Sequence, residues 1–105
     1  MSSTTQVAYV GRNNNIAIEL QENDVTLSDL SGITRVALVL SGDSEEVVDS
    51  NVDAGIIDWS NDYILIKLGL SSVPVGRYTG KVETYDADNP QGIVWTDSMP
   101  VWVNS

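Results

Sequence analysis

The residues of this sequence with the most obvious capacity for chemistry are carboxylates, which gather near predicted turns. Hard cations such as Ca²⁺ need several oxygen ligands that converge on one point, and loops with paired Asp can supply them. A segment with the length of an EF-hand loop carries Asp86, Asp88 and Asp97 at its first, third and last positions. Pro90 and Gln91 stand where that loop needs Asn or Asp and a turn Gly. These three Asp residues are therefore weak metal candidates, and turn formation is the simpler interpretation.

Nucleophilic and imidazole chemistry is excluded by the composition. The chain has no His and no Cys, so it can form neither a Ser-His-Asp triad nor a Cys–His pair, a zinc site with N or S ligands, or a disulfide. Two carboxylates about 5–9.5 Å apart across a cleft could still hydrolyse a glycoside, but no pair in the sequence stands out from the rest. We expect a protein that is not an enzyme and that holds no cofactor.

The net charge of the chain restricts the classes of molecule that it is expected to bind. Its 15 Asp and Glu against 5 Lys and Arg give a formal net charge of -10, which repels nucleic-acid backbones and anionic lipid. The first residues lack the basic and apolar regions of a signal peptide, and no apolar run is long enough to span a membrane. We therefore expect protein partners, no nucleic acid and no membrane, with use in the cytoplasm or export by assembly or lysis.

Trp59, Trp95 and Trp102 are the remaining candidates for a binding surface, because Trp is enriched at protein interfaces. One of the three is expected to anchor the core. Trp102 lies between Val101 and Val103, and successive strand residues point to opposite faces. If the two valines are in the core, Trp102 points outward, where it could meet another chain. Packing between strands on the solvent face is the alternative.

The elements that must position these side chains are short strands. Runs of Val, Ile and Leu recur at intervals of roughly 8–12 residues between clusters of turn residues, which is typical of a sandwich or barrel. The densest run, 33–40, predicts a central strand buried on both faces. The whole chain, 1–105, is predicted to be one all-β domain of seven to nine strands, with residues 1–6 as an N-terminal arm or tail.

One motif indicates the type of sandwich. Pro74, Gly76 and Tyr78 precede and open an alternating strand. In immunoglobulin-like domains a Tyr near the start of strand F hydrogen-bonds to backbone a few residues upstream, which forms a tyrosine corner. Here Gly76 would supply the permissive backbone and Pro74 would stiffen the approach. We expect a structural role for these three residues.

The segments 28–40, 63–68 and 75–85, taken in that order, resemble the N-terminal immunoglobulin-like module of phage baseplate upper proteins and related small phage virion proteins. The likeness covers roughly Asp29 to Val103. It implies a single Ig-like antiparallel β-sandwich without catalytic residues, located in the virion after assembly in the host cytoplasm. Its partners would be other phage virion proteins of the capsid or tail, and homo-oligomerisation stays open.

The sequence lacks the long extension of baseplate proteins, which favours a capsid decoration protein or a head–tail or tail-fibre adaptor. The expected function is therefore that of a non-enzymatic virion structural or accessory protein that acts by protein–protein contact, with Trp102, Trp95 and Trp59 as interface candidates. Two alternatives remain. One is a Ca²⁺- or carbohydrate-binding accessory module that uses loop Asp and Trp residues, and the other is a small hydrolase.

Overall fold

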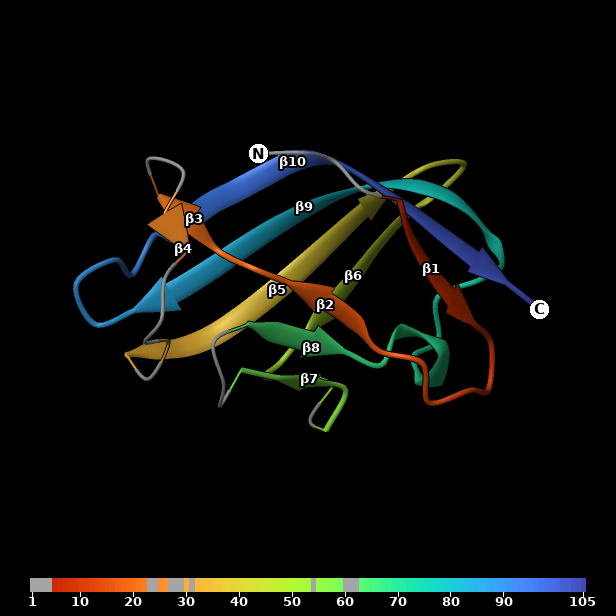
Figure 1. Ribbon diagram of the computed structural model, residues 1–105, viewed down its shortest axis with the longest axis horizontal. Coiled ribbons are helices and arrows are strands. Elements are labelled where there is room, and N and C mark those ends of the chain that lie inside the picture. Colours follow the sequence, from red (N-terminus) through yellow and green to blue (C-terminus); the bar gives the residue numbers. More distant parts are fainter. Residues whose placement is uncertain (1–4, 23–24, 27–29, 31, 54, 60–62) are drawn as a thin grey trace.

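A five-stranded sheet forms one layer of the molecule, in the strand order β1-β10-β9-β5-β6 (Figure 1). The computed structural model describes residues 5–22, 25–26, 30, 32–53, 55–59 and 63–105. The strands of this sheet are β1 (Gln6–Tyr9), β5 (Ile33–Ser41), β6 (Glu45–Asp49), β9 (Gly76–Asp86) and β10 (Ile93–Asn104).

The second layer is a smaller sheet with the order β2-β8-β7. Its strands are β2 (Ile16–Ile18), β7 (Ile57–Asp58) and β8 (Ile64–Ile66), and a separate short pair consists of β3 (Gln21–Glu22) and β4 (Val25–Thr26). The two layers together contain eight strands, within the predicted range of seven to nine.

The core lies between the two sheets and follows from alternation along their strands. In β5, Val36, Leu38 and Leu40 are fully buried, and they belong to the same apolar cluster as Ile64 and Ile66 of β8. Branched aliphatic side chains suit this pleated surface. The predicted all-β sandwich is thus confirmed, and its core is built from Val, Ile and Leu without cross-links.

The tyrosine corner fixes the entry to β9. The Tyr78 hydroxyl donates a hydrogen bond of 2.8 Å to the carbonyl oxygen of Pro74, four residues upstream. Burial raises the pKa of Tyr78, which acts in the same direction as the need for a protonated donor in this hydrogen bond. The ring packs beside Gly76 and Gly42, and a Cβ at Gly42 would lie 2.8 Å from the Arg77 carbonyl oxygen. Arg77 lies between Gly76 and Tyr78 of this corner, and its side chain points to the opposite face from Tyr78.

Three details differ from the sequence-based expectations. β1 runs parallel to β10, so the larger sheet is not wholly antiparallel. The two strands lie at opposite ends of the sequence, so no hairpin turn forces them to be antiparallel. β9 is the middle strand of that sheet, with β5 beside it. The outer face of β5 is buried only in part, because Ala37 is buried there whereas Arg35 and Val39 keep partial exposure. Of the predicted arm, residues 1–4 lie outside the described ranges, and Gln6 pairs with Val101 in the sheet.

Strand β10 runs without a break from Ile93 to Asn104. A proline in a strand, such as Pro100, normally lies at a strand start, a bulge or an edge, because it has no N–H to donate to the ladder. Pro100 lies inside β10 opposite Thr79, and the strand passes irregularities between Val94 and Met99 before it reaches that position. The pairing with β1 begins only at Val101, so the missing N–H of Pro100 leaves no gap in that ladder.

Candidate functional site

Two of the three tryptophans are fastened to the core. The Trp59 indole N–H donates to the carbonyl oxygen of Ile33 at 3.0 Å, and the Trp95 indole N–H donates to the Thr84 hydroxyl at 2.8 Å. Both rings are partly buried and pack against the apolar core. The polar atom of each ring is satisfied within the chain, which is the usual arrangement of a structural Trp.

Trp102 is placed differently. Val101 and Val103 on either side of it are fully buried, so its ring lies on the outer face of the five-stranded sheet, the face turned away from the smaller sheet. Its cross-strand neighbours are Arg77 of β9 and Val7 of β1. The Cζ atom of Arg77 lies over the indole ring, 4.3 Å from its centroid. This is the geometry of a cation–π contact.

We call the surface formed by Val7, Tyr9, Arg77 and Trp102 the aromatic patch. Val7, Trp102 and Arg77 form one row across three adjacent strands, and Tyr9 lies two residues beyond Val7 on the same face of β1. Tyr9 is 43 % exposed, Arg77 is exposed, and Val7 and Trp102 are half-buried. Trp, Tyr and Arg are the residue types that most often dominate the energy of a protein interface.

The guanidinium group of Arg77 has no acceptor within the described part of the chain. The ion pairs among those residues join Arg35 to Asp49 and Lys81 to Glu83. Among the described residues, the Arg77 side chain has its ring contact but no hydrogen bond. A guanidinium group carries five N–H donors in one plane, so Arg77 offers a set of donors that sit beside an aromatic surface.

A second arginine on the same outer face has a carboxylate partner. The Cζ atom of Arg35 lies over the Tyr85 ring, 4.5 Å from its centroid. Its Nε is 3.0 Å from both carboxylate oxygens of Asp49, and its Nη2 also bonds to Asp49. Asp49 accepts a further bond of 2.9 Å from the Asn51 amide. The hydrogen bond from Arg35 lowers the pKa of Asp49 against the opposing effect of burial, so this carboxylate is held in its charged form.

The three Asp residues that were metal candidates are not brought together. Asp86 uses its carboxylate in a turn, where Oδ1 accepts from the amides of Asp88 and Asn89 at 2.9 Å each. Asp97 is an exposed residue of β10. In the ranges that the structure describes, no three acidic residues cluster in a way that could hold a metal ion. The turn interpretation thus accounts for Asp86 directly.

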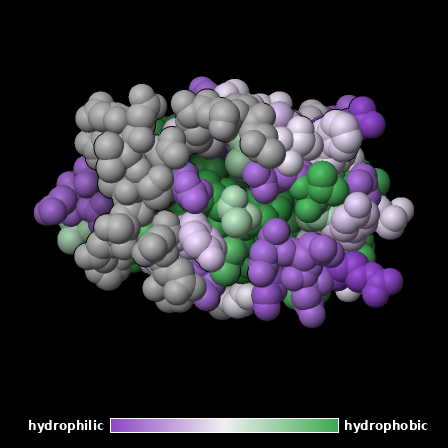
Figure 2. Space-filling model, in the orientation of Figure 1, coloured by the Kyte–Doolittle hydropathy of each residue, from purple (hydrophilic) through white to green (hydrophobic). Residues whose placement is uncertain are grey.

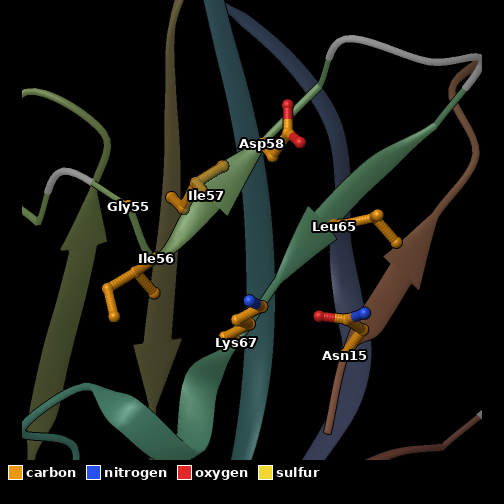
Figure 3. A pocket seen from close by; sticks show the side chains of 7 residues that line it. All are labelled: Asn15, Gly55, Ile56, Ile57, Asp58, Leu65 and Lys67. Atoms are coloured by element: carbon orange, nitrogen blue, oxygen red, sulfur yellow. The ribbon is translucent and has the colours of Figure 1, made fainter. Parts of the chain in front are cut away.

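The outer face of the smaller sheet carries a shallow depression of about 510 Å³. Figure 2 shows hydrophobic side chains at the centre of this side of the molecule, with hydrophilic side chains around them. The depression is lined by Asn15, Gly55, Ile56, Ile57, Asp58, Leu65 and Lys67. Asp58 lies toward one end, while Lys67 and Asn15 lie toward the other (Figure 3). Its lining holds a single carboxylate, so the paired carboxylates of a glycosidase are not formed here.

Comparisons of the chain with protein-family models, curated proteins and solved structures found no significant match. Within the described ranges, no helix is long and apolar enough to cross a membrane. The case for a function therefore depends on the geometry of the chain itself and on the resemblance in its sequence.

Sequence reasoning identified Trp102 but not the arginine above it. Trp102 could be found because its orientation depends only on alternation along one strand. The pairing with Arg77 depends on the register between β9 and β10, which shifts twice between Val94 and Met99. Arg35 and Asp49 were missed for a similar reason. Asp49 stands beside turn-forming residues in the sequence, but it is the last residue of β6, on the outer face.

Proposed function

We propose that this chain is a non-enzymatic structural or accessory module that acts by protein–protein contact through the aromatic patch. The observation that carries the proposal is the outward Trp102 ring beneath an arginine that has no acceptor in the described part of the chain. A ring and a cation in this position gain most from burial when a partner excludes water from them.

The patch is also suited to binding because it is already organised. Its residues come from the paired strands β1, β9 and β10 rather than from loops. The backbone of Arg77 lies within the tyrosine corner, between Gly76 and Tyr78. Association then costs little ordering of the backbone, and more of the contact energy is retained as affinity.

The assembly that we propose is a virion, with the chain as a capsid decoration protein or a head–tail or tail-fibre adaptor. The support for this step is the sequence resemblance to phage immunoglobulin-like modules together with the absence of His and Cys. A strongly acidic module without cross-links stays soluble by charge repulsion until a complementary protein surface binds it.

Quantitative mass spectrometry of purified phage particles tests the assembly. We expect this chain at a copy number that matches the symmetry of the capsid or tail, and its absence from pure particles would refute a virion role. The contact surface is tested by rebinding the purified chain to particles that lack it. Trp102→Ala should abolish stable rebinding. Val94→Ala, which changes an exposed residue of the same strand outside the aromatic patch, should leave rebinding intact.

A further inference from the structure

The outer face of the five-stranded sheet contains the same contact twice. Arg35 lies over Tyr85 at 4.5 Å, and Arg77 lies over Trp102 at 4.3 Å. In each pair the arginine and the ring are outward residues of neighbouring strands: β5 and β9 in the first, β9 and β10 in the second. The two distances agree closely, so the ring contact itself does not distinguish the pairs.

The pairs differ in what faces the donors of the guanidinium group. Asp49 receives hydrogen bonds from Nε and Nη2 of Arg35, which completes a stack of ring, guanidinium and carboxylate. Arg77 has the ring, but no carboxylate pairs with it in the described ranges. Planar N–H donors match the two oxygens of a carboxylate better than any other common protein group.

We propose that the Arg77–Trp102 pair is a receptor for the side-chain carboxylate of an Asp or Glu on a partner protein. This rests on the proposed function and adds the chemistry of the partner to it. The bound carboxylate takes the place beside Arg77 that Asp49 takes beside Arg35. Polyanions such as nucleic acid are disfavoured, because a chain of net charge -10 repels dense phosphate. A single carboxylate brings one charge and feels that repulsion far less.

The surroundings define the partner segment further. Val7 is the direct neighbour of Trp102 on the side away from Arg77, and the exposed Tyr9 follows it along β1. An acidic side chain that reaches Arg77 therefore brings the residues beside it over apolar and aromatic surface. We infer an acidic residue with apolar or aromatic neighbours in the partner. A run of acidic residues would place further charge against the acidic remainder of this molecule.

The three arginines of the chain allow the proposal to be tested on the isolated protein. Arg12, Arg35 and Arg77 give three Nε–Hε signals in a ¹⁵N-labelled sample. Sodium acetate serves as the carboxylate probe, with sodium chloride at equal ionic strength as the control. We expect the Arg77 signal to shift at acetate concentrations roughly fivefold lower than Arg12 requires, because the ring holds its guanidinium in place. The Arg35 signal should not move, because Asp49 already occupies its donors.

Two substitutions separate the contributions of the pair. Trp102→Leu should reduce the response of Arg77 to that of Arg12, since it removes the ring and keeps the charge. The matched control Tyr85→Leu removes the other ring and should leave the response of Arg77 unchanged. If Arg77 responds to acetate no more than Arg12 does in the unaltered protein, the carboxylate receptor is refuted.

A dilution series identifies the source of the carboxylate. If the Arg77 signal shifts on dilution without acetate, a second copy of this chain supplies the carboxylate in the isolated protein; if it does not shift, the carboxylate comes from a different protein. The failure of this proposal is distinct from failure of the proposed function. Particle binding that requires Trp102 but not the charge of Arg77, as tested with Arg77→Gln, would keep the contact surface and refute the carboxylate.

Discussion

Two arginines lie over aromatic rings on one face of this protein, and only one of them has a carboxylate partner. Arg35, over Tyr85, is held by Asp49 at the edge of the sheet formed by β5 and β6. Arg77, over Trp102, lies in the aromatic patch on the same face, toward the opposite edge of the sheet. It has no acceptor in the described part of the chain. In the first arrangement Asp49 of the same chain accepts hydrogen bonds from the arginine, and the contact stabilises the fold. The second has no carboxylate among the described residues, so a partner molecule could supply one.

The difference shows how one local arrangement can serve structure or binding. A guanidinium group over a ring is well ordered and weakly hydrated, and its contribution depends on what meets its donors. At β6, Asp49 meets them and also bonds to the following loop at Asn51, so the pair fastens an edge strand. In the aromatic patch Arg77 is exposed and no described carboxylate pairs with it, so the pair can be used for recognition.

The largest expected difference in stability is between substitution of Trp95, which packs on the core, and substitution of Trp102, which lies in the aromatic patch. Trp95→Ala should lower the free energy of unfolding by about 2–4 kcal/mol, because it removes a ring that packs on the core and leaves Thr84 without its donor. Trp102→Ala should cost about 1 kcal/mol or less, since that ring lies on the outer face. Urea unfolding of both variants measures this. Equal losses would mean that Trp102 is a core residue.

The next largest effect on stability should come from breaking the ion pair between Arg35 and Asp49. Asp49→Ala should destabilise the isolated domain by roughly 1–3 kcal/mol, because it removes charged hydrogen bonds to Arg35 and the acceptor of the Asn51 amide. Glu83→Ala is the control, since the 3.7 Å ion pair of Glu83 with Lys81 is weak. If the two variants have the same denaturation midpoint, Asp49 does not fasten β6.

The ion pair between Arg35 and Asp49 should also affect how the free energy of unfolding depends on pH in acid. Asp49 has a pKa below its ordinary value when folded, chiefly because of the hydrogen bond from Arg35. Its contribution to stability is complete above the pKa of the unfolded chain, roughly 3.9, and is lost as the pH falls through the lower folded pKa. Asp49→Asn should therefore flatten the fall of unfolding free energy between about pH 5 and 3. The exposed Asp88→Asn should reproduce the unaltered profile, and an identical slope in Asp49→Asn would contradict the assignment.

The smallest effect on the stability of the fold should come from substitution of Arg77, which has no acceptor in the described part of the chain. Arg77→Gln should change the free energy of unfolding by no more than about 0.5 kcal/mol, because it removes only a surface cation–π contact. Its effect should appear in rebinding to particles instead. A loss of stability as large as that of Asp49→Ala would place Arg77 among the structural residues.

Sequence reasoning succeeded where the determining interactions are local. The tyrosine corner involves Pro74, Gly76 and Tyr78 within five consecutive positions, and the hydrogen bond expected there is present. The burial of the inner face of β9 and the orientation of Trp102 follow from alternation alone. Neither of these features requires knowledge of which strands are neighbours.

It failed where the register between two paired strands determines which side chains meet. The Arg35–Asp49 pair joins two strands of a hairpin on their outer face, and the Arg77–Trp102 pair depends on a ladder with two irregularities. Pro100 suggested a break in what is a single strand because a proline lacks a ladder donor, and only the short reach of β1 explains why that loss is tolerated. The acidic turn at Asp86 looked like part of a metal loop because Asp serves both purposes.

The contrast between the two arginines is tested most directly by the solvent-exchange rates of their Nε–H protons. Measured by NMR in the free protein, exchange should be slow at Arg35, whose Nε–H is bonded to Asp49, and fast at Arg77, at a rate close to that of Arg12. Slow exchange at Arg77 would show that its donors are already bonded within the chain, and the aromatic patch would then have no open position for a partner's carboxylate.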